Sequence, residues 1–345
     1  MSYLLLFYFS VAECRYVTLF FYSMTRSRSK PASRGTKAGT HVPVLLRQVL
    51  QHLSPAEGET IVDCTLGFGG HAAKFMTLAG SEGLLLGLDV DADQLKLTAR
   101  YLGSRAARLI SHNRNFSQLP AVLAEEKIGK VDIIFADLGV SSMQIDDPGR
   151  GIGYASDGLL DMRLDQSLEM SAADVLATIS EKDLSRALAD YSDEPDHKRI
   201  ANWIVNQRQA LPMTRTKQLV RLILAAKGVT ENNWKKSPVS RFGKAHPAAQ
   251  TFQAIRIIVN DEFANLKKLL AAAPTCLAPG GRVGIITFHQ GEDKIVDAAL
   301  RASLAAGDYE AISPKPITPT AQERSRNTRS ASAKFRWARK AKTGL

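Results

Sequence analysis

The sequence predicts an α/β protein with a doubly wound, mostly parallel sheet and an inserted all-helical domain. Short apolar runs alternate with helical patterns from residue 60 to residue 136, which is typical of parallel strands that are buried on both faces. A glycine-rich turn at 67–70 follows the first apolar run, at the edge where such sheets bind ligands. The alternation then stops for about a hundred residues, which is longer than an ordinary crossover between strands.

Composition limits the classes of protein that the chain can belong to. The chain has 345 residues, of which 45% are hydrophobic, and this suffices for a large core. Its net charge of +11 predicts a polyanionic partner, because lysine and arginine release counterions when they bind phosphates. Cys14, Cys64 and Cys276 are far apart, and the histidines lack metal-ligand spacing. We therefore expect no disulfide framework, no metal site and a reducing, cytoplasmic location.

The N-terminal segment is apolar and aromatic over residues 1–23. Glu13 and Arg15 interrupt it, which leaves runs too short to span a bilayer. It shows neither a basic n-region nor a small-residue cleavage site, and the stretch that starts at Met24 is polar and basic, like an ordinary N-terminus. We expect translation to begin at Met24, residues 1–40 to be a disordered or misassigned extension, and no membrane association.

The first part of the sheet domain is predicted over residues 41–147. A helix is expected to end at Leu53, before the first strand. The apolar runs predict strands at 60–64, 83–88, 108–111 and 131–136. The helical patterns between the strands lie at 71–79, 91–102 and 117–126.

The inserted domain is predicted over residues 148–244. Its helices are expected at 172–178, 181–191, 197–209 and 216–227, and Ser171 and Ser180 are typical N-caps for the first two. The sheet domain is expected to resume over 245–320, with a long helix at 247–272, a strand at 282–288 and a helix at 292–305. Residues 321–345 interleave cations with Phe335 and Trp337, as in a basic tail that grips phosphates and stacks on unpaired bases.

The glycine-rich turn indicates a nucleoside cofactor. Asp89, about twenty residues downstream, ends the second predicted strand and can accept hydrogen bonds from the two hydroxyls of a ribose. Gly67, Gly69 and Ala72 also satisfy the G-x-G-x-x-A fingerprint, so a nicotinamide or flavin dinucleotide remains an alternative. Asp63 disfavours a pyrophosphate but attracts the sulfonium and ammonium groups of S-adenosylmethionine. The residues therefore favour the methyl donor.

Asp137 follows the fourth predicted strand, so we expect it beside the methyl group to be transferred. The exocyclic amine of a base is a poor nucleophile because its lone pair is delocalised into the ring. A carboxylate that accepts N–H hydrogen bonds concentrates electron density on the nitrogen and can then take up the proton. Asp137 is therefore the predicted catalytic residue, with a simple cofactor contact or an N-cap as the alternative. A base in folded RNA must also be flipped out of its stack, and the insertion and the basic tail could supply that surface.

Several blocks occur together in a fixed order from about residue 41 to residue 340. They are His41-Val-Pro-Val-Leu45, Asp63-Cys-Thr-Leu-Gly-Phe-Gly-Gly-His71, Asp137-Leu-Gly-Val-Ser-Ser142 with Gln144, Asp157-Gly158 with Leu160-Asp-Met-Arg163, His246-Pro247 with Thr251-Phe-Gln-Ala-Ile-Arg256 and Val259-Asn-Asp-Glu262, Phe288-His289 with Glu292-Asp293, and Arg329-Ser330 with Ser332-Ala-Lys334. In these blocks the chain resembles the bacterial small-subunit ribosomal RNA methyltransferase H family, also called MraW.

The resemblance implies a class I S-adenosylmethionine-dependent methyltransferase with a Rossmann-like fold. It implies methylation of N4 of one cytidine, position 1402 in standard rRNA numbering, in the decoding region of 16S rRNA. The expected partner is 16S rRNA within the 30S subunit, a homodimer is allowed, and no DNA is expected. The implied cofactor contacts are Gly69, Gly70, His71, Asp89, Phe116, Asp137 and Gln144.

The sequence also departs from the family pattern. Gln290-Gly291 replaces the usual Ser-Leu, Gln250 replaces an arginine, Gly151-Ile-Gly-Tyr154 replaces Gly-Phe-Ser-Phe, and Leu159 replaces a proline. We expect these positions on the substrate side, where they bear on RNA positioning more than on cofactor binding. Two other functions stay open: a non-catalytic RNA-binding or ribosome-assembly protein that keeps the cofactor fold, and an NAD-dependent oxidoreductase.

Overall fold

The computed structural model describes residues 43–103, 105, 107–236 and 245–342. The predictions for residues 1–40, and His41 and Val42 of the first block, lie outside this part of the chain. Within it, no helix is long and apolar enough to cross a membrane.

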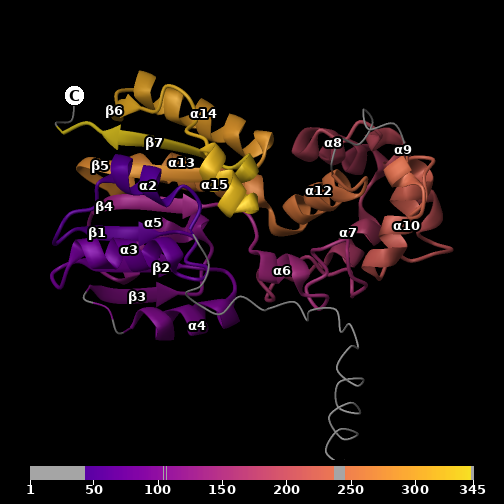
Figure 1. Cartoon of the computed structure of the whole chain (residues 1–345), viewed down its shortest axis with the longest axis horizontal. Helices are drawn as coiled ribbons and strands as arrows, with labels where there is room; N and C mark the ends of the chain where they lie inside the picture. The colour runs from indigo at the N-terminus through magenta and orange to yellow at the C-terminus, as the bar shows by residue number, and fades with distance from the viewer. Residues whose placement is uncertain (1–42, 104, 106, 237–244, 343–345) are drawn as a thin grey trace, which may run out of the picture. The chain divides into compact units, whose positions relative to one another are not determined.

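A seven-stranded sheet organises the described part of the chain, in the order β3-β2-β1-β4-β5-β7-β6 (Figure 1). The strands are β1 (Thr60–Asp63), β2 (Leu84–Leu88), β3 (Arg108–His112), β4 (Val131–Asp137), β5 (Leu277–Thr287), β6 (Tyr309–Ile312) and β7 (Lys334–Lys340). The strands β1 to β5 pair in parallel, and β7 is antiparallel to both β5 and β6. The predicted doubly wound, mostly parallel sheet is confirmed, and the four predicted strands before residue 140 match to within two residues.

Helices cover both faces of the sheet because successive residues of a strand point to opposite sides. In β4, Ile133 and Phe135 face one hydrophobic cluster, and Ile134 and Ala136 face another. The first cluster packs under α2 (Leu46–Leu53), α3 (Gly70–Ala79) and α4 (Ala92–Leu102). The second packs under η1 (Phe116–Gln118), α5 (Leu119–Glu125), α13 (Glu262–Cys276) and α14 (Gln290–Ala305). These clusters fix the strand ends, and the ends carry the site.

The insertion has a hydrophobic cluster of its own, which extends from Ile152 to Ile255. Its helices are α7 (Ala172–Thr178), α8 (Glu181–Ser192), α9 (His197–Gln207) and α10 (Thr216–Ala226), and the short segments α6 (Ser142–Asp146) and η2 (Trp234–Lys236) lie before and after them. Ser171 and Ser180 cap α7 and α8 through hydrogen bonds from the amides of Asp174 and Asp183, as predicted.

The long helix predicted at 247–272 is wrong. Two helices take its place, α12 (Ala249–Asn260) and α13, and they meet at Asp261 in a left-handed conformation with φ of +48°. An aspartate tolerates this conformation better than most residues do. Periodicity alone could not reveal the break, because apolar residues continue on both sides of it. Phe252 and Ile255 of α12 pack in the cluster of the insertion, whereas α13 packs on the sheet.

The basic tail predicted at 321–345 is also wrong over its described residues. After α15 (Ala321–Arg326) and η3 (Thr328–Ser332), the chain forms β7 inside the sheet. Phe335 is fully buried, so its ring cannot stack on a base, and the partly buried Trp337 already stacks on His52 with 5.3 Å between ring centroids. The alternation Lys-Phe-Arg-Trp-Ala-Arg is the period-two pattern of a strand, and composition obscured it.

Arg336 shows how β7 is fixed. Its guanidinium donates to Asp293 (Nε to Oδ1, 2.6 Å) and to Asp297 (Nη1 to Oδ1, 2.6 Å) of α14, with only 7% of its side chain exposed. We expect Arg336→Met to lower the free energy of unfolding in urea by about 2 kcal/mol, because Asp293 loses a charged hydrogen-bond partner. Arg339→Met, on the same strand but 45% exposed and 3.9 Å from Glu310, should change it by less than about 0.5 kcal/mol. Equal losses would contradict this account.

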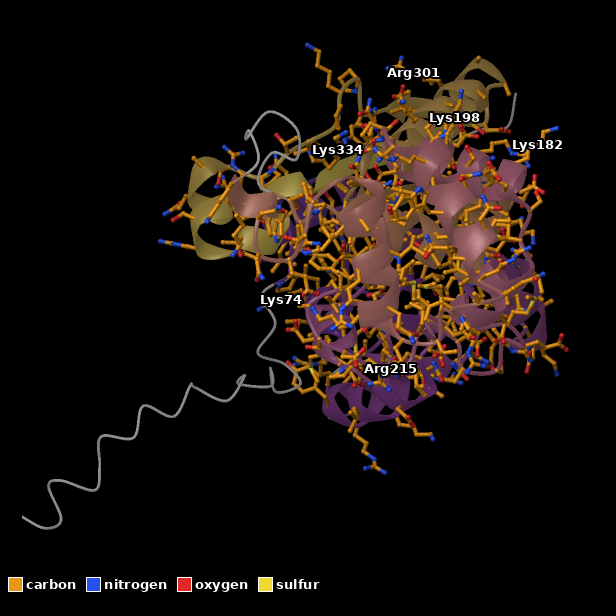
Figure 2. All side chains as sticks on the ribbon, turned by 90° about the vertical axis from the view of Figure 1, so that its right-hand side faces the viewer. Lys74, Lys182, Lys198, Arg215, Arg301 and Lys334 are labelled. Carbon is orange, nitrogen blue, oxygen red and sulfur yellow. The ribbon has the colours of Figure 1, made fainter. Side chains whose placement is uncertain are left out.

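Cations are spread over several elements of the fold. Figure 2 labels Lys74, Lys182, Lys198, Arg215, Arg301 and Lys334, which come from different helices, strands and loops. Three of them have acidic partners within 3.2 Å, since Arg215 binds Asp157, Arg301 binds Asp297 and Lys334 binds Asp293. Lys182 and Lys198 line one shallow hollow between α8 and α9.

Candidate active site

A cleft of about 910 Å³ lies at the carboxyl ends of the parallel strands, where such sheets bind ligands. One wall consists of the turns after β1, β2, β3 and β4. Residues 259–266, where α12 meets α13, and residues of the segment 164–168 from the insertion also line the cleft. It is therefore built by both parts of the chain.

Four carboxyl groups follow four of the parallel strands. Asp63 and Asp137 end β1 and β4, Asp89 follows β2, and Glu292 lies in the first turn of α14, after β5. Asp89 and Asp63 affect each other electrostatically, as do Asp63 and Asp137, and Asp137 and Glu292. This arrangement makes the cleft strongly acidic and suited to a cationic ligand.

Asp89 fixes the glycine-rich turn. Its Oδ2 accepts a hydrogen bond from the amide of Gly67 (2.7 Å), and its Oδ1 accepts one from the amide of Asp91 (2.9 Å). The carbonyl of Gly67 in turn accepts from the hydroxyl of Thr98 and from Gln94 (3.3 Å). A carboxylate oxygen has more than one acceptor position, so both oxygens of Asp89 can still bind a pair of ribose hydroxyls. Burial raises the pKa of Asp89 to about 6.

Asp63 is almost inaccessible, with 2% of its surface exposed. Its Oδ1 accepts a hydrogen bond from the amide of Thr65 (3.1 Å). Burial, together with the charge of Asp89, nevertheless raises the pKa of Asp63 to about 7. A buried acid with so little hydrogen bonding gains from a cation nearby, as the sequence analysis expected for a sulfonium.

Asp137 pairs with His71. The amide of Asp137 donates to Oγ1 of Thr65 (2.7 Å), and its Oδ2 lies 3.6 Å from Nδ1 of His71. Because Nε2 of His71 contacts the carbonyl of Val44 (2.9 Å), which can only accept, Nε2 carries a proton and Nδ1 faces the carboxyl group. Among the described residues, Oδ1 of Asp137 has no hydrogen-bond partner. Burial, and then the charges of Asp63 and Glu292, raise the pKa of Asp137 to about 8.

Glu292 lies close enough to Asp137 to affect its charge, and the rings of His289 and Phe263 lie next to Glu292. Glu292 accepts from the amide of Phe288 (2.9 Å) and lies 3.1 Å from Nε2 of His289. Burial acts to raise the pKa of Glu292, but these contacts outweigh it and the pKa is lowered. Phe263 stacks on His289 with ring centroids 5.6 Å apart. This side of the cleft thus offers a flat apolar wall beside a charged carboxylate.

Eight of the nine predicted site residues line the cleft. They are Asp63, Gly67, Gly70, His71, Asp89, Phe116, Asp137 and Gln144. Gly69 does not: it has a φ of +72°, and a Cβ there would lie 2.8 Å from Cγ2 of Thr98, so its glycine serves the packing of α3 against α4. Gln144 uses its amide to accept from Ser141 and to donate to Asp91 (3.1 Å), which also binds Arg150 (2.7 Å).

Sequence reasoning missed the residues beyond Asp137. Glu292 follows β5 as the three aspartates follow their strands, so the rule that ligands bind at carboxyl ends could have found it. Asn260 belonged to a block of the family resemblance but was given no role, and Phe263 had no signal, because both were assigned to the middle of a long helix. They reach the cleft through the break at Asp261.

The positions that depart from the family pattern do not line the cleft. Gln250 donates to the carbonyls of Ser192 (2.9 Å) and Asp193 (3.0 Å) at the end of α8. Tyr154 stacks on His246 and packs with the insertion, and neither residue lines the cleft. Gly291 is different, because a Cβ there would lie 2.7 Å from Cζ of Phe263. The glycine lets that ring approach the start of α14.

The sheet order, the acidic cleft and the tied glycine turn define an α/β enzyme that binds a nucleoside cofactor. The model of the MraW methylase family matches residues 38–341, and the chain belongs to this family. Ribosomal RNA small subunit methyltransferase H of Geotalea uraniireducens is 39% identical over 316 residues, which cover 87% of this chain and 98% of that protein. The protein of the same name from Acidobacterium capsulatum is 38% identical over 309 residues, covering 87% and 98%.

A solved rRNA methylase from Streptococcus thermophilus covers 87% of this chain and 99% of its own, with 10% identity and a TM-score of 0.39. At that level of similarity it adds nothing to the description of the fold. Membership in this methylase family confirms S-adenosylmethionine as the cofactor. It also argues against the alternative of an NAD-dependent oxidoreductase. The residues of the cleft fit S-adenosylmethionine. Asp89 keeps acceptor positions for the ribose hydroxyls, and the buried carboxyl groups can bind a cation.

Proposed function

We propose that the chain methylates N4 of one cytidine in the decoding region of 16S rRNA, at position 1402, within the 30S subunit. The relatives named above are small-subunit rRNA methyltransferases, which supports an rRNA substrate. The observation that carries the choice of an exocyclic amine is Asp137, whose buried Oδ1 has no hydrogen-bond partner among the described residues. A free acceptor at the end of β4 suits an N–H donor.

Asp137 serves as the acceptor for the amine. The bound cofactor supplies a methyl group made electrophilic by the sulfonium. The ionised Asp137 accepts a hydrogen bond from the cytosine N4 amine, which orients the nitrogen lone pair, and then takes up the proton that the amine loses. Nδ1 of His71 lies 3.6 Å from Oδ2 of Asp137. Glu292 and Phe263 also line the cleft, and a flipped base would enter beside them.

The proposal is tested by methylation of 30S particles from cells that lack the modification. Labelled S-adenosylmethionine is added with the purified chain, and nucleosides from the digested 16S rRNA are separated by mass spectrometry. We expect N4-methylcytidine at one position, and less product from deproteinised rRNA. Label in another nucleoside would contradict the proposed target. Binding of the particle without any label would favour the non-catalytic alternative.

A further inference from the structure

Asn260, the last residue of α12, holds a distant part of the backbone. Its Oδ1 accepts a hydrogen bond from the amide of Leu164 (2.7 Å), and its Nδ2 donates to the carbonyls of Met162 (2.8 Å) and Arg256 (2.9 Å). Leu164 and Met162 lie nearly a hundred residues earlier in the chain. One amide side chain thus uses both its polar atoms to attach the insertion to the junction between α12 and α13.

Two left-handed residues flank this attachment. Met162 has a φ of +63° and is fully buried, and Asp261 has a φ of +48°. A bulky non-glycine residue in this region is strained and persists only where its surroundings hold it. Asn260 bonds to the carbonyl of Met162 and immediately precedes Asp261. We call these three hydrogen bonds of the Asn260 side chain the clamp. Because the clamp holds the backbone at Met162, it sets the direction in which the chain continues from Met162.

The chain that leaves Met162 forms a wall of the cleft. Leu164, Asp165, Ser167 and Leu168 line it, together with residues 259–263 around the clamp. Arg163 supports the same segment, because it donates to the carbonyl of Leu168 (2.7 Å) and pairs with Asp161 (2.8 Å). The far end of the segment is thus held independently of Asn260, and the near end depends on it.

We propose that Asn260 is a positioning residue for the acceptor base, which it serves by fixing the segment 164–168 as the wall opposite the strand ends. This inference rests on the proposed function of the cleft. Methyl transfer requires the nucleophile at near-attack distance, and a displacement of about 1 Å can cost a hundredfold in rate. Asn260 fixes the near end of this wall, whereas the cofactor contacts on β1 and β2 do not depend on Asn260.

The test compares three variants. Asn260→Ala removes every clamp contact. Asn260→Asp keeps an acceptor for the amide of Leu164 but places an acceptor against the carbonyls of Met162 and Arg256. Gln250→Ala is the matched control, because Gln250 is also an amide on α12 that donates to two distant carbonyls, those of Ser192 and Asp193, away from the cleft.

For each variant we would measure kcat and KM for 30S particles, the Kd for S-adenosylmethionine by calorimetry, and amide hydrogen exchange in the peptide 159–169. We expect Asn260→Ala to lower kcat/KM for the particle at least thirtyfold, to change the cofactor Kd less than threefold, and to speed exchange in this peptide. Asn260→Asp should lower kcat/KM with slower exchange than Asn260→Ala. Gln250→Ala should leave all three within twofold of wild type.

A loss of kcat/KM that is no larger for both Asn260 variants than for Gln250→Ala would overturn the inference. So would unchanged exchange in the peptide, or a cofactor Kd that weakens as much as kcat/KM does. If Asn260→Ala does not fold, Asn260→Asp decides by the same criteria. Absence of methyl transfer by the wild-type chain contradicts the proposed function instead, and exchange in the peptide then still shows whether the clamp exists.

Discussion

Asp137→Asn is expected to lower kcat for methyl transfer at saturating cofactor by about 10² to 10⁴, the usual contribution of a positioned proton acceptor. Asparagine has nearly the same shape, and the backbone bond from Asp137 to Thr65 (2.7 Å) does not involve the side chain. What the variant loses is an anionic oxygen that can accept the N–H of the amine and then its proton. Single-turnover kinetics with 30S particles would measure the loss without interference from product release.

The matched control is Asp132→Asn, the same substitution at the opposite end of the same strand. Oδ2 of Asp132 accepts from the amide of Thr60 (2.8 Å), and an asparagine can still accept that bond. We expect kcat within twofold of wild type for this variant. If Asp137→Asn kept more than a tenth of the wild-type kcat, Asp137 would bind substrate or cofactor but would not take up the proton.

The sequence was sufficient to predict the part of the site that binds the methyl donor. Asp63, Asp89 and Asp137 each stand at the end of an apolar run, so their convergence follows from the parallel sheet alone. Packing explains why Gly69 differs from Gly67 and Gly70, because a Cβ at Gly69 would meet Thr98 of α4. The glycine pattern alone cannot show which of the three glycines faces the ligand and which faces α4.

The part of the cleft proposed to bind the acceptor base could not be predicted in the same way, because it depends on contacts between residues far apart in the chain. Asn260 meets Leu164 across 96 residues, at a helix break that periodicity does not show. The tail was misjudged for a related reason. From the sequence, Lys334 and Arg336 were interpreted as solvent-exposed cations. In the structure both form ion pairs with Asp293, because β7 is part of the sheet.

The affinity for S-adenosylmethionine is expected to rise with pH between about 6 and 8. Burial raises the pKa of Asp89 to about 6, of Asp63 to about 7 and of Asp137 to about 8, from an ordinary value of 3.8. A cation in the cleft favours the ionised carboxylates, so binding releases protons. Each proton released corresponds to a tenfold change in Kd for each pH unit, and the increase from pH 6 to pH 8 should lie between about tenfold and a hundredfold.

Calorimetry at pH 7 in buffers of different ionisation enthalpy would count the protons directly. S-adenosylhomocysteine keeps the ammonium but lacks the sulfonium, so its affinity should depend less on pH. Asp63→Asn should reduce the number of protons released for S-adenosylmethionine. A Kd that is constant from pH 6 to pH 8, or an identical dependence for both ligands, would show that the buried acids do not sense the charge of the donor.

Asp63, Asp89 and Asp137 affect the stability of the fold in the opposite direction to their effect on cofactor affinity as the pH rises. Because their pKa values are raised in the folded state, the folded chain binds more protons than the unfolded chain between about pH 4 and pH 8, and these groups lower stability as pH rises through that range. The cofactor counteracts this effect only while it is bound. The increase in Tm on adding a fixed excess of S-adenosylmethionine should therefore be larger at pH 8 than at pH 6. An increase that is larger at pH 6 would mean that the cofactor binds the protonated acids, and the cation would then have to lie elsewhere in the cleft.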